Sequence, residues 1–157
     1  MVEEDPNKIP EPLGRALYVG CFVDAEHCGN VITRRLYSGT LLSVNNALFK
    51  SSRMRQNTVQ SSTFGSEIVA LRIARDMIVD IRIKFKCFEV PLARPENVCC
   101  DNNEVVKNTS ISESTLSKKH NAINYHCMRD AAAAGILRVW KEDTAKDLAD
   151  PLMKLPP

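Results

Sequence analysis

Leu17-Tyr-Val-Gly-Cys-Phe-Val-Asp24 is the stretch of sequence that first indicates the fold. It has the length and apolar composition of a buried strand, and it ends on a carboxylate. Two further strands are expected over 38–44 and 47–55, with Asn45-Asn46 between them as a tight hairpin turn. Three consecutive strands of this kind predict an antiparallel meander.

The second half of the chain alternates between helical and strand patterns. Thr63 is expected to be the N-cap of a long helix that ends near Cys87, and Gly135 is expected to end a later one. Strands reached through a helix are typical of parallel additions to a sheet. The fold class is therefore α/β, a five-stranded mixed sheet flanked by helices. The expected elements after the meander are a helix over 63–87, a strand over 97–101, helices over 102–109 and 120–134, a strand over 136–140 and a helix that starts at Asp150.

Length and composition predict one globular domain. Of the 157 residues, 1–15 are rich in proline and acid and are expected to be a tail or linker, which leaves 16–157 for the domain. The net charge of +2 is too small to indicate nucleic-acid binding by itself. No apolar run is long enough for a membrane span, and the acidic start does not resemble a secretory leader. We expect an intracellular protein whose six cysteines are reduced.

Four acids lie where one expected element gives way to the next. Asp24 and Asp101 end strands, Glu67 lies in the first turn of the long helix, and Asp150 opens the last helix. Carboxylates gathered at one sheet edge repel one another unless cations neutralise them, and oxygen ligands favour Mg²⁺ or Mn²⁺ over zinc. We expect the four to form one cation-sized cluster that holds two ions. The alternative is that they are solvated surface residues, with Glu67 and Asp150 favoured by helix dipoles.

Five short sequence motifs favour the metal-binding cluster over solvated surface acids. They are Cys21-Phe-Val-Asp24-Ala-Glu-His27-Cys28-Gly29, Ser61-Ser-Thr-Phe-Gly-Ser-Glu67, Cys100-Asp101-Asn102, Ser117-Lys-Lys-His120 and Leu148-Ala149-Asp150. In this order they resemble the ribonuclease H domains of copia-type retrotransposons. Each block is weak alone, but together they extend over most of residues 16–156.

The resemblance implies a ribonuclease H-like fold and a function. The expected reaction is hydrolysis of the RNA strand of an RNA–DNA hybrid during reverse transcription, by a domain fused to or working with a reverse transcriptase. The expected location is the cytoplasm (a virus-like particle) or the nucleus. Asp24, Glu67, Asp101 and Asp150 match the family's catalytic metal ligands, although Asp143 and Asp147 lie close enough to Asp150 to leave the fourth ligand open.

Several basic and polar residues are candidates for contacts to the hybrid, by phosphate pairing or by a bond to a ribose hydroxyl. His126 is better explained as part of a basic helix than as a catalytic group. Two other hypotheses stay open: a decayed element that keeps the fold without catalysis, and an unrelated protein-interaction domain with its acids scattered. The nucleic-acid candidates are Arg34, Arg35, Arg53, Arg55, Asn102, Lys118, Lys119 and His120.

Overall fold

The computed structural model describes residues 14–26, 36–93, 95–111, 121–143 and 147–150. The expected order of elements is confirmed as far as the fifth strand, with ends that differ by one or two residues. The expected last helix lies outside the described residues, apart from its first residue, Asp150. The elements are β1 (Val19–Ala25), β2 (Tyr37–Val44), β3 (Ala47–Arg55), α1 (Thr63–Cys87), β4 (Glu96–Cys100), α2 (Asn103–Ser110), α3 (Ala122–Ala133) and β5 (Leu137–Lys141).

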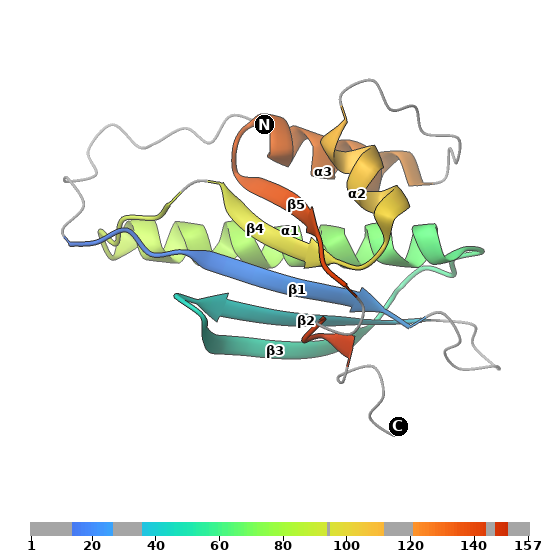
Figure 1. Ribbon diagram of the computed structural model, residues 1–157, viewed down its shortest axis with the longest axis horizontal. Helices are drawn as coiled ribbons and strands as arrows, with labels where there is room; N and C mark the ends of the chain where they lie inside the picture. Colours follow the sequence, from blue (N-terminus) through green and yellow to red (C-terminus); the bar gives the residue numbers. More distant parts are fainter. Residues whose placement is uncertain (1–13, 27–35, 94, 112–120, 144–146, 151–157) are drawn as a thin grey trace.

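The strands form one mixed sheet in the order β3-β2-β1-β4-β5 (Figure 1). β1 pairs antiparallel with β2, and β2 with β3, while β4 lies parallel to both β1 and β5. The hairpin between β2 and β3 turns at Asn45 and Asn46, whose φ angles are 48° and 66°. Two successive positive φ angles are the geometry that matches the twist of a two-residue hairpin, so the prediction of this turn is confirmed.

α1 packs along the sheet and forms most of the core with β1 (Figure 1). Its cap is Ser62, whose hydroxyl accepts a hydrogen bond from the Gly65 amide at 3.2 Å, so the assignment of the cap to Thr63 is wrong by one residue. Although α1 has 25 residues, neither it nor any other described helix is long and apolar enough to cross a membrane. The helical core positions are Ile68, Leu71, Ala74 and Ile78, and those of β1 are Val19, Cys21 and Val23.

A buried ion pair joins α1, β4 and β1 at the end of the sheet where β1 and β4 begin. Arg82 Nη1 lies 2.5 Å from Glu96 Oε1, and both side chains are almost completely buried. The second carboxylate oxygen of Glu96 accepts a hydrogen bond from the Val19 amide at 3.0 Å. The opposite charges compensate each other, and the contacts of Glu96 to Arg82 and Val19 tie the three elements together.

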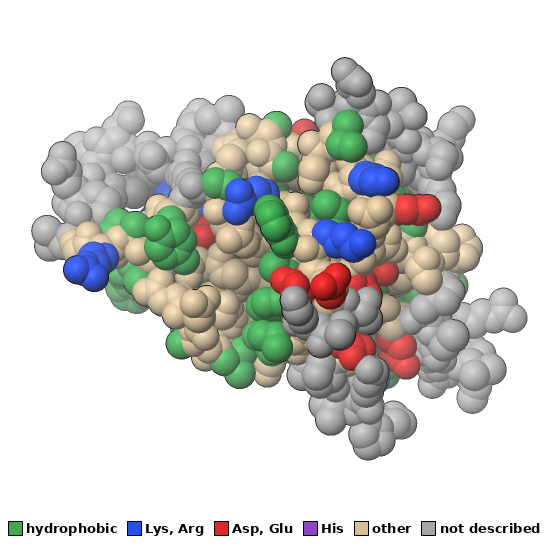
Figure 2. Space-filling model, viewed as in Figure 1, with side chains coloured by type: hydrophobic (Ala, Val, Ile, Leu, Met, Phe, Trp, Pro, Cys, Tyr) green, Lys and Arg blue, Asp and Glu red, His purple; other side chains and the backbone are tan. Residues whose placement is uncertain are grey.

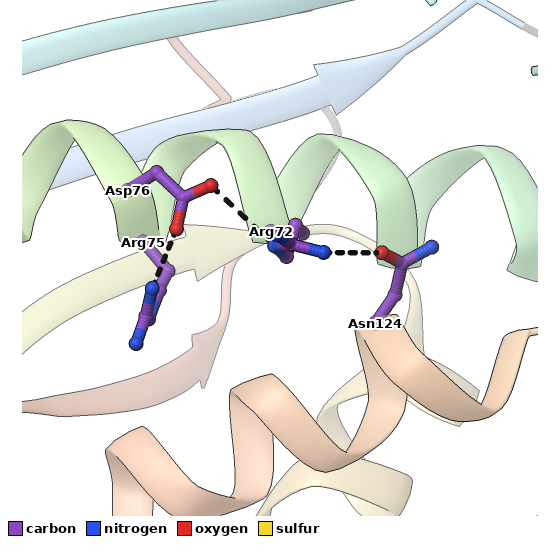
Figure 3. Close-up of polar contacts among 4 residues, drawn as sticks. All are labelled: Arg72, Arg75, Asp76 and Asn124. Carbon is purple, nitrogen blue, oxygen red and sulfur yellow. Dashed lines mark hydrogen bonds and ion pairs between the residues drawn. The ribbon is translucent and has the colours of Figure 1, made fainter. Parts of the chain in front are cut away.

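A second polar group links α1 to α3 (Figure 3). Arg72 Nη1 donates to Asn124 Oδ1 of α3 at 3.2 Å, and Arg72 Nε lies 3.4 Å from Asp76 Oδ2. Arg75 pairs with the other oxygen of Asp76 at 2.6 Å. This group positions α3 against α1, and the single carboxylate of Asp76 pairs with both arginines.

Candidate metal centre and nucleic-acid interface

The acidic candidates meet at the edge of the sheet where β1 and β4 end. Because these strands are parallel neighbours, their carboxyl ends lie side by side. Asp24 is the second-last residue of β1, and Asp101 comes directly after β4. α1 begins at the same edge, and acidic side chains gather on this part of the surface (Figures 1 and 2).

Glu67 reaches this edge from α1. It is the fifth residue of the helix, in the second turn, so its expected place in the first turn is wrong by one residue. Its Oε1 accepts a hydrogen bond from Asn102 Nδ2 at 3.1 Å. The pKa of Glu67 is raised to about 8, chiefly by burial and also by the charges of Asp101, Asp24 and Asp147, against the opposing effect of the Asn102 bond.

Asp147 is the most buried acid at this edge, with only 5% of the residue exposed. Its Oδ1 accepts a hydrogen bond from the Ala149 amide at 2.8 Å, but its buried Oδ2 has no partner among the described residues. Its pKa is raised to about 6, chiefly by burial and also by the charges of Asp24, Asp101 and Asp150, against the lowering effect of the Ala149 hydrogen bond. An unpaired, buried carboxylate oxygen beside other acids indicates a position suited to a cation.

These mutual effects place Asp24, Glu67, Asp101 and Asp147 within one electrostatic neighbourhood. Asp24 and Asp101 each raise the pKa of both Glu67 and Asp147. Among the described His, Cys, Asp and Glu side chains, however, no three lie close enough to bind a single metal ion. These four acids therefore share one edge of the sheet, called the acid edge below, without forming the cation-sized cluster that the sequence predicted. Their convergence also contradicts the hypothesis of an unrelated domain with scattered acids.

The donor set at this edge fits a hard divalent cation. All the converging donors are carboxylate oxygens, and like charges so placed need a counter-charge. Asp150 lies near Asp147, since it contributes to that residue's raised pKa and its amide donates to the Asp147 carbonyl at 3.3 Å. Burial distinguishes the two, because Asp150 is only partly buried.

Two of the expected phosphate-contact residues lie on β3, near the acids. The pairing register aligns Asp24 with Gly39 and Gly39 with Arg53, so Arg53 lies two strands, roughly 10 Å, from Asp24. Arg53 stacks over the Tyr37 ring at 4.4 Å and lies 3.5 Å from a carboxylate oxygen of Glu26. Arg55, at the end of the same strand, is exposed.

The other candidates divide into described and undescribed residues. Asn102 caps α2 and bonds to Glu67, and its contact to a ribose hydroxyl stays a prediction. His126 is exposed on α3, with its ring edge-on to Tyr125 at 5.2 Å, which agrees with a surface role. Residues outside the described part of the chain are Arg34, Arg35, Lys118, Lys119 and His120.

A group of buried amides beside the start of α1 was not anticipated from the sequence. Asn121 is completely buried, and among the described residues neither of its side-chain polar atoms has a hydrogen-bond partner. A Cβ on Gly65 would lie 3.1 Å from Asn121 Nδ2 and 2.5 Å from Gln60 Oε1, so glycine is what allows these amides to approach the helix. Asn121 Nδ2 is the unpaired donor of this group and is suited to binding an anion, whereas the unpaired atom of Gln60 is its carbonyl oxygen and its Nε2 donates to Thr58 Oγ1 at 3.0 Å.

Comparisons with known proteins agree with this architecture. No protein-family model matches the sequence, and no curated protein matches it significantly. The N-terminal RNase H domain of a Mycobacterium tuberculosis protein, solved as a fusion with maltose-binding protein, is 16% identical, with a TM-score of 0.66 over 88% of this chain and 91% of that one. LC11-RNase H1 in complex with an RNA/DNA hybrid is 12% identical, with a TM-score of 0.66 over 85% of this chain and 92% of that one.

A third similar structure is a much longer protein. The prototype foamy virus protease-reverse transcriptase matches with a TM-score of 0.53 and 12% identity. The match covers 98% of this chain but only 22% of the viral one. At these identities the likeness is one of fold, and the mixed sheet in the order β3-β2-β1-β4-β5 with its flanking helices is the ribonuclease H fold.

Proposed function

We propose that this chain is a divalent-cation-dependent ribonuclease that hydrolyses the RNA strand of RNA–DNA hybrids. The observation that carries the proposal is the convergence of Asp24, Glu67, Asp101 and Asp147 at the carboxyl ends of β1 and β4. The fold supports it, since one protein with the same fold was solved with an RNA/DNA hybrid. The motif resemblance to copia-type domains supplies the same substrate independently.

The carboxylates would hold Mg²⁺ or Mn²⁺. Asp24 and Asp101, which influence both other acids, are the proposed central ligands, with Glu67 and one of Asp147 and Asp150 beside them. When bound, such ions lower the pKa of a water molecule and stabilise the charge on the phosphodiester. The protein's part is to hold the oxygen ligands on rigid elements, because β1, β4 and α1 are fixed by the core and by the Arg82–Glu96 pair.

Two places at this edge are proposed to contact the phosphates of the hybrid. Arg53 and Arg55 on β3 would pair with phosphates of one nucleic-acid strand. They would contribute to an affinity for the hybrid that falls as the salt concentration rises. The start of α1, with the unpaired Nδ2 of Asn121 beside Gly65, would receive another phosphate. Backbone contacts of this kind recognise the shape of the hybrid rather than its sequence.

The biological setting is proposed to be a retrotransposon reverse transcriptase. The copia-type motifs support this setting, and so does the match to a domain-sized part of a viral protease-reverse transcriptase. The domain would then work on hybrids that the polymerase has just made, either fused to it or as its partner.

The deciding experiment is cleavage of a labelled RNA–DNA hybrid in Mg²⁺ by the wild-type protein and by Asp101→Asn. We expect the substitution to lower the cleavage rate at least ~100-fold without unfolding the protein, because it removes a ligand and relieves carboxylate repulsion. Asp130→Asn is the matched control, since Asp130 is exposed on α3 and is not among the candidate ligands. Equal cleavage by Asp101→Asn and the wild type would refute the proposed role.

The same assay ranks the two remaining acids. Asp147 is better buried and has an unpaired oxygen, so we expect Asp147→Asn to lose more activity than Asp150→Asn. The opposite ranking would return the fourth role to Asp150, as the motif resemblance implies.

A decayed copy that keeps the fold is the second candidate. It predicts that the wild-type protein binds the hybrid yet does not cut it at any Mg²⁺ or Mn²⁺ concentration, whereas an active enzyme cuts with a defined cation optimum.

A further inference from the structure

Asn102 connects the start of α2 to the acidic edge through both ends of one side-chain amide. Its Oδ1 accepts hydrogen bonds from the Glu104 amide at 2.9 Å and from the Val105 amide at 3.3 Å. Its Nδ2 donates to Glu67 Oε1 at 3.1 Å. One residue therefore caps one helix and contacts an acid of another.

The capping bonds fix the direction in which this amide donates. Two backbone N–H groups of α2 face Oδ1, so the reversed amide would place donors against donors. The side chain also follows directly after β4, next to Asp101, so its position is set by a strand end and a helix start together. The donor is thus held toward Glu67 before any ligand binds.

Capping alone does not require asparagine at this position. Asparagine, aspartate and serine cap helices about equally well. Aspartate, however, offers no donor and would add a fifth negative charge, and a serine side chain is too short to reach Glu67 while it caps α2. Asparagine is the capping residue that also supplies a donor to the carboxylate.

We propose that Asn102 is a positioning residue, which restrains the Glu67 carboxylate at the acid edge so that it can serve there as a ligand to a divalent cation. Glu67 has a long side chain with several rotamers, whereas Asp24 and Asp101 are short and follow the strand ends. Its orientation therefore depends most on a partner. This inference rests on the proposed function, because it assigns to Asn102 a task in that same site.

The proposal predicts that capping and cation binding can be separated by substitution. Asn102→Ser keeps the cap and removes the bond to Glu67, whereas Asn102→Ala removes both. For Asn102→Ser we expect an unchanged unfolding midpoint in urea without cation, a 10–100-fold weaker affinity for Mn²⁺ by calorimetric titration, and a kcat lower by a similar factor with KM for the hybrid unchanged. Asn103→Ser is the control for the same chemical change one residue away, on an exposed side chain, and should match the wild type in all three measurements.

A double-mutant cycle on Mn²⁺ affinity tests whether Asn102 acts through Glu67. In the Glu67→Gln background, where the other acids still give weaker binding, Asn102→Ser should cause no further loss. Equal, additive losses of Mn²⁺ affinity in both backgrounds would overturn the positioning role. A raised KM for the hybrid with unchanged Mn²⁺ affinity would also overturn it, and would instead indicate that Asn102 contacts the substrate. A wild-type protein that neither binds Mn²⁺ nor cuts the hybrid would overturn the proposed function and this inference with it. A wild-type protein that does both, and an Asn102→Ser variant equal to it, would remove this inference alone.

Discussion

β1, α1 and β4 carry charged groups at two opposite edges of the sheet. At one edge the charges compensate each other, and at the other edge they have the same sign. Where β1 and β4 begin, Arg82 and Glu96 neutralise each other, and the Val19 amide satisfies the second oxygen of Glu96. Where they end, the charges of Asp24 and Asp101 add to the effect of burial in raising the pKa of Glu67, and no balancing cation lies among the described contacts of Glu67.

This difference separates a structural site from a candidate functional one. A buried ion pair whose opposite charges compensate each other has no net charge left for an ion to balance. A set of neighbouring carboxylates with raised pKa values lowers the stability of the fold. A cation that binds between them relieves the repulsion and stabilises the folded state. The first end stabilises the arrangement of elements on which the second end depends.

The largest effect that tests this comparison should come from the compensated end. Glu96→Gln leaves Arg82 as a buried cation without its counter-charge, so we expect a loss of about 3–5 kcal/mol in the free energy of unfolding, measured by urea denaturation. Asp80→Asn is the control: Asp80 pairs with Lys84 at 2.7 Å, but both side chains are 63% exposed, so the loss should be about 0.5 kcal/mol or less. Similar losses in both variants would show that burial does not determine how much the Arg82–Glu96 pair contributes to the free energy of unfolding.

Much of this architecture could be predicted from sequence, because the decisive elements are long and locally marked. The apolar run before Asp24, the Asn45-Asn46 turn and the periodic apolar face of α1 each specify their own structure. Alternation of strand and helix then limits the topology, since parallel strands need a crossover. Because β1 and β4 are parallel neighbours in that topology, the acids at the ends of these two strands are expected to lie close together.

What could not be predicted depends on contacts that leave no periodic pattern. Ser61, Ser62 and Thr63 are all good caps, so only the structure selects Ser62. Asp147 and Asp150 lie three residues apart in a short turn, and which of them is buried depends on packing rather than on composition. The bond from Asn102 to Glu67 joins positions 35 residues apart and has no local signal at all.

A smaller effect should come from the titration of Glu67. The pKa of Glu67 in the folded protein is about 8, above its ordinary value of 4.5, so between these two pH values the folded state keeps a proton that the unfolded chain has released. Stability in the absence of cations should therefore fall as the pH rises from about 4.5 to 8. Glu67→Gln has no such proton to lose, and we expect it to be about 1–3 kcal/mol more stable than the wild type at pH 8 and equal to it at pH 4.

The measurement is a series of urea titrations from pH 4 to 8 in a chelating buffer. Asp130→Asn provides the control, because Asp130 is exposed on α3 and its removal should leave the pH profile of the wild type unchanged. A wild-type stability that rises over this interval, parallel to that of Glu67→Gln, would mean that the acids at this edge are not in conflict.

The smallest effect expected is the stabilisation that a cation confers. An ion that binds only the folded protein, at ten times its dissociation constant, adds about 1.4 kcal/mol, which for a domain of this size corresponds to a rise of about 3–6 °C in Tm. We expect this rise with Mg²⁺ at pH 8 for the wild type, and a clearly smaller one for Glu67→Gln, which has one carboxylate fewer and less repulsion to relieve. The Glu96→Gln variant separates the two ends of the molecule: it should melt at a lower temperature yet gain the same increment from Mg²⁺, because its acid edge is intact. K⁺ at matched ionic strength is the control for general screening. If K⁺ raised Tm as much as Mg²⁺, or if Glu67→Gln gained as much as the wild type, the acid edge would be responding to salt and not to a bound ion.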